Sequence, residues 1–198
     1  MRKMLVSLAL LLAAAAPAAA PAQKAQAVAV FAGGCFWCSE SDFDKLPGVL
    51  STTSGYTGGK LVNPTYKQVS AGGTGHIEAV RIVYDPAKVS YAKLVSHLFQ
   101  TVDPLDGGGQ FCDRGDHYRA AIFAATPAEQ RIAAAAKARA ATVLKKPIAT
   151  LILPAAKFYP AEDYHQDYYK KNPVKYKYYR TSCGRDAQVK KVWGRTIV

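Results

Sequence analysis

The middle of the N-terminal third of the chain contains the stretch Gly33-Gly34-Cys35-Phe36-Trp37-Cys38. An apolar run over 27–31 precedes it and predicts a strand, and residues 35–46 predict a helix that ends at Pro47-Gly48. The two glycines permit a tight turn, so Cys35 is expected at or near the first turn of this helix. The positive end of a helix dipole favours an anion, which predicts a thiolate at Cys35. The alternative is a structural disulfide or a buried thiol.

The first residues have the layout of a secretory signal peptide. A short positive start is followed by a 13-residue apolar run over Met4–Ala16, which is too short to span a bilayer. Small residues place cleavage within Ala20–Ala27, so residues 1–27 are interpreted as signal peptide and linker. The alternative is an uncleaved anchor. Export to the periplasm, an oxidising compartment, follows from this interpretation, and disulfide chemistry is expected there.

The chain of 198 residues carries a net charge of +12 and four cysteines. Its length suits a single domain over 28–198. The basic excess is compatible with acidic partners or membranes, although such a surface is most often simply solvated. The basic aromatic run over 175–180 is similar to a nucleic-acid surface, but in an exported protein we expect tyrosine rings that pack and hydroxyls that are solvated. No nucleic-acid partner and no stable membrane insertion are expected.

The remaining chain alternates strands with helices. Strands are predicted over 76–84, 118–124 and 147–153, helices over 90–102 and 126–144, and a short helix from Pro160. Loops are predicted over 54–66, 71–75 and 104–115. The glycine spacing fits neither the Walker motif nor the dinucleotide fingerprint, which argues against a nucleotide. The alternation predicts an α/β sandwich in which helices cover a sheet and long irregular loops connect the elements.

Glu78 lies within the predicted strand over 76–84. Alternation places it on one face with Val80, Ile82 and Tyr84, and the other face is also largely apolar. A carboxyl group in such surroundings has a raised pKa, which would make it a proton donor near neutral pH. The alternative is a strand-end carboxylate that faces solvent or pairs with Arg81.

The cysteines are compatible with several kinds of functional site. The spacing of Cys35 and Cys38 is that of thioredoxin-like redox sites, although aromatic residues between the cysteines are unusual there. A zinc site would need Cys112 and a histidine in addition, and the chain has one close cysteine pair, so no metal is expected. His117 and His165 are candidate bases for a cysteine hydrolase.

Residues 34–38 resemble the signature of the A-type peptide methionine sulfoxide reductases. Further stretches that look like motifs of that family, in its order, are 54–59, 63–66, 74–80, 113–119 and 161–166. The resemblance implies a two-layer α/β sandwich, related to the ferredoxin-like folds, around a mixed sheet. It also implies reduction of the S epimer of methionine sulfoxide in proteins, no bound cofactor, an external thioredoxin-like dithiol reductant and, by our expectation, a monomer. Whether free methionine sulfoxide is a substrate stays open.

The resemblance also implies roles for individual residues. Cys35 would be the nucleophile and would become a sulfenic acid. The other roles would be methyl-group binding by Phe36 and Trp37, sulfoxide-oxygen binding by Glu78, Tyr66 and Tyr118, and orientation of the site by Asp113.

A second cysteine must resolve the sulfenic acid to a disulfide. Family members commonly use a C-terminal cysteine, which indicates Cys183, and the neighbouring Gly184 suits a mobile arm. Cys38 is the second candidate, because it is near Cys35 in sequence. Cys112 is the third, because it adjoins Asp113.

Overall fold

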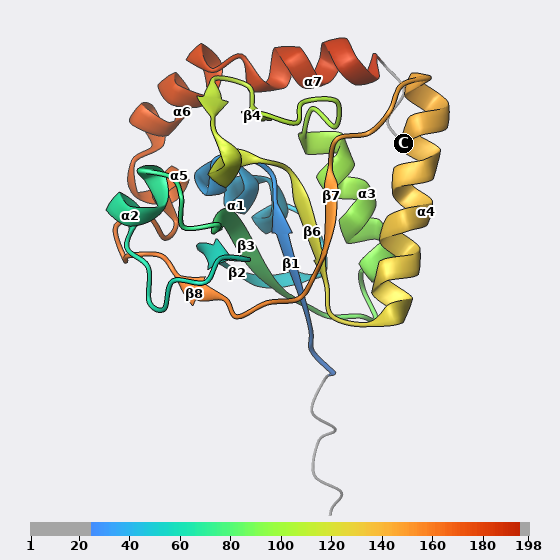
Figure 1. Ribbon diagram of the computed structural model, residues 1–198, viewed down its shortest axis with the longest axis horizontal. Helices are drawn as coiled ribbons and strands as arrows, with labels where there is room; N and C mark the ends of the chain where they lie inside the picture. The colour runs from blue at the N-terminus through green and yellow to red at the C-terminus, as the bar shows by residue number, and fades with distance from the viewer. Residues whose placement is uncertain (1–24, 195–198) are drawn as a thin grey trace, which may run out of the picture.

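The structure, a computed structural model, describes residues 25–194 and is built around a six-stranded mixed sheet (Figure 1). The strand order is β7-β6-β1-β3-β2-β8. The bounds are β1 Ala27–Ala32, β2 Val49–Thr57, β3 Ile77–Tyr84, β6 Ala121–Ala124, β7 Leu151–Pro154 and β8 Tyr159–Pro160. β6 and β7 pair in parallel, and the other neighbours pair antiparallel. A small second sheet contains β4 Gly109–Gln110 and β5 Asp113–Arg114.

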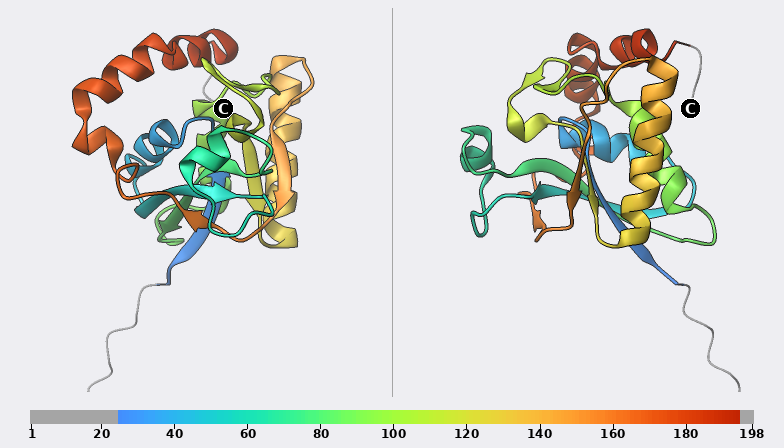
Figure 2. Two further views of the ribbon diagram at one scale, coloured as in Figure 1. Left: turned by 60° about the vertical axis from the view of Figure 1, so that its left-hand side comes forward. Right: turned by 45° about the vertical axis from the view of Figure 1, so that its right-hand side comes forward.

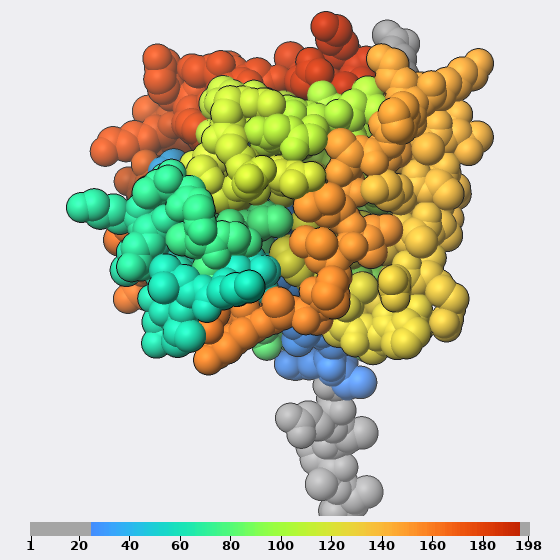
Figure 3. Space-filling model, viewed as in Figure 1, coloured from blue at the N-terminus to red at the C-terminus, as the bar shows by residue number. Residues whose placement is uncertain are grey.

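Helices cover this sheet and extend along one edge of it (Figure 2). Their bounds are α1 Phe36–Asp44, α2 Tyr66–Ser70, α3 Tyr91–Thr101, the 3-10 helix η1 Asp116–Tyr118, α4 Pro127–Leu144, α5 Tyr168–Lys171, α6 Pro173–Ser182 and α7 Arg185–Trp193. The C-terminal helices α6 and α7 form one border of the surface, beside the loop that carries β4 (Figure 3). This arrangement confirms the predicted α/β sandwich with a mixed sheet.

The core explains why β3 has apolar residues on both faces. Val80, Ile82 and Tyr84 belong to the large cluster that α1, α3 and α4 cover. Ile77 and Ala79 belong to a smaller cluster on the other face. The expectation that this strand is buried on both sides is therefore confirmed. Glu78 shares the face of Val80, so its carboxyl group points into the larger core.

β2 is the largest difference from the sequence prediction, which assigned its second half to a loop. Strand β2, Val49–Thr57, consists mainly of serine, threonine and glycine and has few apolar residues. Its partner β3 is strongly apolar and determines the pairing. Gly55 is required because a Cβ there would lie 2.4 Å from the Tyr159 carbonyl oxygen of β8. The absence of a side chain at Gly55 thus allows the edge strand β8 to pair closely with β2, and the glycine does not interrupt the sheet.

Smaller differences concern element bounds. The strand predicted over 118–124 begins at Ala121, because Tyr118 ends η1. The helix predicted from Pro160 is a series of turns, and α5 begins only at Tyr168. The basic aromatic run lies in α6, which the sequence analysis did not assign as a helix. The signal peptide predicted over 1–27 lies almost wholly outside the described residues. Between residues 25 and 194, no helix has the length and apolar character to cross a membrane.

Candidate active site

Cys35 occupies the junction between β1 and α1. Gly33 and Gly34 form the turn, and Gly34 has a φ of 81°, a backbone conformation that favours glycine. A Cβ at Gly34 would lie 2.6 Å from the Cβ of Gln110, so the turn also packs closely on β4. Cys35 is the N-cap of α1, and its carbonyl accepts from the backbone N–H of Cys38 at 3.1 Å. The predicted strand, turn and helix are therefore confirmed.

Cys35 and Cys38 are free thiols that hydrogen-bond to each other below the protein surface. Burial, and then the hydrogen bond to Cys38, raise the pKa of Cys35 well above its usual value. The pKa of Cys38 is lowered to about 7, because the Cys35 thiol hydrogen-bonds to its thiolate and because the charges of Arg185 and Arg180 are near. The expectation of a readily ionised Cys35 is wrong. Desolvation of the buried sulfur disfavours the thiolate more than the positive end of the α1 dipole favours it.

Glu78 is 1% exposed and lies next to the start of α1. Its Oε2 accepts a hydrogen bond of 3.0 Å from the backbone N–H of Phe36. Burial raises the pKa of Glu78 to about 8 despite this bond, and the charges of Asp113 and Cys38 add to the shift. The carboxyl group is therefore largely protonated at neutral pH, in agreement with the raised pKa predicted from its apolar surroundings; its role as a proton donor stays a prediction.

Tyr66 and Tyr118 reach the same place from different elements. Tyr66 begins α2, whose start is fixed by the Thr65 capping box and by a 2.8 Å bond from the Tyr66 N–H to Glu162 Oε1. Tyr118 ends η1 and hydrogen-bonds to Tyr66 through the side chains. Burial, and then the charge of Glu78, raise the pKa of both tyrosines. Both therefore remain phenols that can donate a proton.

Asp113 contacts the site through a residue that the sequence analysis did not single out. The Tyr179 hydroxyl donates to Asp113 Oδ2 at 2.5 Å, and the same hydroxyl faces Cys35, to whose sulfur it can donate instead when Cys35 is a thiolate. Burial raises the pKa of Asp113. Tyr179 belongs to the run over 175–180, where tyrosines are so frequent that no pattern marks one of them.

Phe36 and Trp37 form an aromatic wall beside these polar groups. The Trp37 Nε1–H donates to His165 Nδ1 at 3.1 Å, and its ring stacks on Tyr168 at 3.7 Å with an interplanar angle of 6°. The Phe36 ring lies 4.9 Å from the His165 ring. Burial lowers the pKa of His165, which keeps the imidazole neutral as an acceptor for Trp37. His165 thus positions the wall, a role that its sequence context did not reveal.

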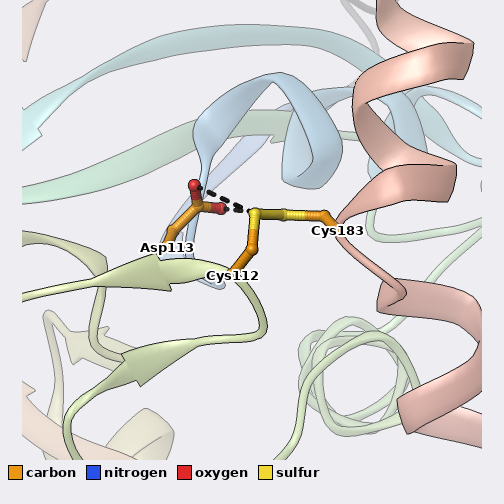
Figure 4. A group of neighbouring side chains, drawn as sticks. All are labelled: Cys112, Asp113 and Cys183. Carbon is orange, nitrogen blue, oxygen red and sulfur yellow. Dashed lines mark hydrogen bonds between the residues drawn. A yellow bond between two sulfur atoms is a disulfide. The ribbon is translucent and has the colours of Figure 1, made fainter.

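Cys112 and Cys183 form a disulfide that lies beside Asp113 (Figure 4). Their sulfur atoms are 3.8 Å and 3.9 Å from the Asp113 carboxylate oxygens. Within residues 25–194 these three residues form the only cluster with spacing suited to a metal ion, but the disulfide occupies both sulfur atoms. The structure therefore brings Cys38 to Cys35 and joins Cys183 to Cys112.

Residues 27–197 match the family described as peptide methionine sulfoxide reductase. The chain belongs to this family. The peptide methionine sulfoxide reductase MsrA 2 of Rhizobium meliloti is 56% identical over 88% of this chain and 87% of its own length. The MsrA 2 of Caulobacter vibrioides is 54% identical over 98% of this chain and 100% of its own length. The resemblance to A-type reductases is thereby confirmed.

Solved structures agree with this reductase fold. Methionine sulfoxide reductase A of Corynebacterium diphtheriae superposes with a TM-score of 0.68 at 36% identity, covering 77% of this chain and 78% of the other. Reduced Mxr1 from Saccharomyces cerevisiae gives a TM-score of 0.72 at 31% identity, covering 78% and 89%. This reductase is therefore an oxidoreductase, and the cysteine chemistry of its site has to account for that activity.

Proposed function

We propose that this chain reduces the S epimer of methionine sulfoxide in proteins to methionine, with Cys35 as the nucleophile. The observation that carries the proposal is the meeting of the buried, protonated Glu78 and the buried Cys35 thiol with two half-buried phenols, Tyr66 and Tyr118. The aromatic wall of Phe36 and Trp37 supplies an apolar surface for the methyl group of the substrate.

Glu78 performs the first task, activation of the sulfoxide. A sulfoxide sulfur is a poor electrophile until its oxygen gains a proton or strong hydrogen bonds. The Oε2 of Glu78 already accepts from Phe36, so the other oxygen of the carboxyl group is left to carry the proton. Tyr66 and Tyr118 stabilise the developing charge on the substrate oxygen from two further directions.

Cys35 then attacks the substrate sulfur. Its proton moves to the acceptor with which it hydrogen-bonds, the Cys38 sulfur. The substrate sulfur is reduced by two electrons and leaves as methionine, and the Cys35 sulfur is oxidised to a sulfenic acid that retains the oxygen. Asp113 and Tyr179 orient the nucleophile through the hydrogen bond to its sulfur.

Cys38 is the resolving cysteine that the geometry favours. It hydrogen-bonds to Cys35, whereas Cys183 is joined to Cys112. Condensation of the sulfenic acid with the Cys38 thiol gives a Cys35–Cys38 disulfide and water. An external dithiol then reduces this bond and is itself oxidised to a disulfide. We assign a thioredoxin-like protein as that dithiol, and yeast Mxr1 has been solved in complex with Trx2.

A general dithiol–disulfide oxidoreductase is the second candidate, favoured by the lowered pKa of Cys38. Exchange with protein disulfides requires an accessible sulfur. Cys35 is 6% exposed and Cys38 is 1% exposed, which supports a small sulfoxide side chain as substrate instead.

Export to the periplasm is part of the proposal and depends on the apolar run over Met4–Ala16. The mature chain is proposed to be a monomer without membrane insertion. Fractionation of cells that produce the full chain, with mass measurement of the product, tests this. A product that begins between Ala20 and Ala27 in the periplasmic fraction is expected, and full-length protein in the cytoplasm would overturn it.

The reaction is tested with S and R methionine sulfoxide peptides offered separately, with dithiothreitol as reductant. We expect the wild type to reduce only the S epimer and the Cys35→Ser variant to reduce neither. Folded wild type that reduces neither epimer would exclude the proposed function, and exchange at protein disulfides would then be measured.

A further inference from the structure

Glu40 is a buried carboxyl group on α1 that the proposed reaction does not use. It is only 1% exposed and lies one helical turn after Trp37, on the same side of the helix. Its Oε2 accepts a hydrogen bond of 3.0 Å from the backbone N–H of Asp167. Burial raises the pKa of Glu40 to about 7, so the carboxyl group is kept at this place against a cost in desolvation.

Asp167 lies between two residues that contact the Trp37 ring. His165 accepts from the Trp37 Nε1–H at 3.1 Å, and the Tyr168 ring stacks on the Trp37 ring at 3.7 Å. The backbone between these two contacts is joined to α1 by the bond from Asp167 to Glu40. Helix α1 therefore holds the segment over 165–168 at two places one turn apart, and α5, which follows this segment, lies against α1 (Figure 1).

The backbone conformation of Asp167 depends on a fixed N–H. Asp167 has a φ of 54°, in the left-handed region that residues other than glycine rarely adopt. It ends the turns over 163–167, and α5 begins at the next residue, Tyr168. The direction of the chain at the stacked tyrosine therefore follows from the conformation that the bond to Glu40 holds.

The other anchors of this part of the chain act elsewhere. The Gln166 side chain bonds to the backbone of Ser54, which fixes the segment to β2. Asp44, near the end of α1, accepts from the Tyr169 hydroxyl at 2.7 Å, which fixes a residue beyond the stack. Glu40 differs from both, because its bond joins the segment to α1 between the two contacts on the Trp37 ring.

We propose that Glu40 is a positioning residue that fixes the Trp37 ring in the aromatic wall and thereby makes the enzyme select methyl sulfoxides over larger alkyl sulfoxides. The inference rests on the proposed function, in which this wall binds the methyl group of the substrate. Glu40 acts through the Asp167 N–H, which keeps the segment over 165–168 against the indole ring. A ring held in close packing excludes a further methylene group, whereas a ring that can move admits it.

Two peptides of the same sequence test the inference, one with S methionine sulfoxide and one with the S sulfoxide of ethionine, which has one more methylene group. Glu40→Leu removes the acceptor, and Glu40→Asp shortens the side chain so that it no longer reaches the Asp167 N–H. We expect each variant to raise KM for the methyl peptide about tenfold, as for loss of one hydrogen bond to a charged group, with kcat changed less than about twofold. KM for the ethyl peptide should stay near the wild-type value, so the preference for methyl falls by the same factor.

Three comparisons separate positioning from a general loss of stability. Glu40→Gln keeps an acceptor oxygen and should retain the wild-type preference. Asp44→Ala also removes a bond between α1 and the following segment, but away from the wall, and should retain the preference too. Glu40→Asp tests the inference even if Glu40→Leu does not fold. A wild-type preference in Glu40→Asp, or an equal loss of preference in Asp44→Ala, would overturn the inference.

Hydrogen exchange of the Trp37 indole N–H tests the same contact without a substrate. In the wild type this N–H donates to His165. We expect it to exchange about tenfold faster in Glu40→Asp and at the wild-type rate in Asp44→Ala. An unchanged rate in Glu40→Asp would also overturn the inference. If the wild type reduces neither peptide, the proposed function fails, whereas the exchange rate still decides whether Glu40 positions the Trp37 ring.

Discussion

The Glu78 carboxyl group on β3 accepts a 3.0 Å hydrogen bond from the backbone N–H of Phe36, the first residue of α1. This bond joins the buried acid to the helix that carries the nucleophile at its N-cap. Because one carboxyl oxygen is engaged by a backbone donor, the protonated oxygen has a fixed direction. In this account Glu78 therefore has two roles: it donates a proton to the substrate, and its hydrogen bond to Phe36 helps to hold the start of α1 beside Cys35.

The pH dependence of the reaction follows from Glu78. Its pKa is raised from 4.5 to about 8, so the proton needed for catalysis is lost as the pH rises through about 8. We expect kcat/KM for the sulfoxide to fall above that pH. Glu78→Gln should lower kcat about 10²–10⁴-fold and abolish this alkaline decline. An alkaline decline that persists unchanged in the variant would contradict the assignment.

Stability should respond to the same group with a definite sign. A carboxyl group whose pKa is higher in the folded state stabilises the fold fully below its unfolded value, and this contribution is lost as the pH rises through the folded value. Urea unfolding of the wild type and Glu78→Gln should therefore show the variant gaining relative stability between about pH 4.5 and 8. A difference in unfolding free energy that does not change with pH would contradict a raised pKa.

Tyr66 and Tyr118 should act as a coupled pair. Tyr118→Phe and Tyr66→Phe each remove one donor to the substrate oxygen, and we expect each to lower kcat about 10²-fold. Since the two hydroxyls hydrogen-bond to each other, the double variant should lose less than the product of the single effects. Steady-state kinetics of the three variants measure the coupling, and strictly multiplicative losses would show that the phenols act independently.

The stack of Tyr168 on Trp37 should influence substrate binding rather than chemistry. Removing an aromatic pair of this kind costs about 1 kcal/mol, so Tyr168→Ala should raise KM roughly fivefold. Tyr178→Ala is the matched control, because Tyr178 is 76% exposed on α6. Equal changes in both variants would indicate that the stack has no specific role.

The Cys112–Cys183 disulfide should stabilise the fold. It closes a loop with a sequence separation of 71, for which loop-closure entropy predicts about 4 kcal/mol. The double variant Cys112→Ser/Cys183→Ser should lose a similar amount of unfolding free energy in urea. Cys38→Ser is the control for removing a cysteine outside this disulfide, and an equal loss there would contradict the assignment.

Local patterns in the sequence were sufficient to predict the strand, turn and helix around Cys35, whereas for Glu78 they left both a buried and a solvent-facing carboxyl group open. Alternation on β3 determines the environment of Glu78 because both faces of that strand are apolar. The ionisation of Cys35 could not be predicted, because it depends on burial and on Cys38, which local sequence does not report. Tyr179 and Arg185 lie far along the chain from Cys35, and only the tertiary packing of α6 and α7 brings them to it.

A single turnover without reductant tests the central claim most directly. Wild-type enzyme with reduced Cys35 and Cys38 is mixed with excess S sulfoxide peptide, and the methionine formed and the cysteine linkages are measured by mass spectrometry. We expect one methionine per enzyme, a new Cys35–Cys38 disulfide and an intact Cys112–Cys183 disulfide. No methionine, or methionine with Cys35 linked to Cys183 and Cys38 still free, would contradict this account.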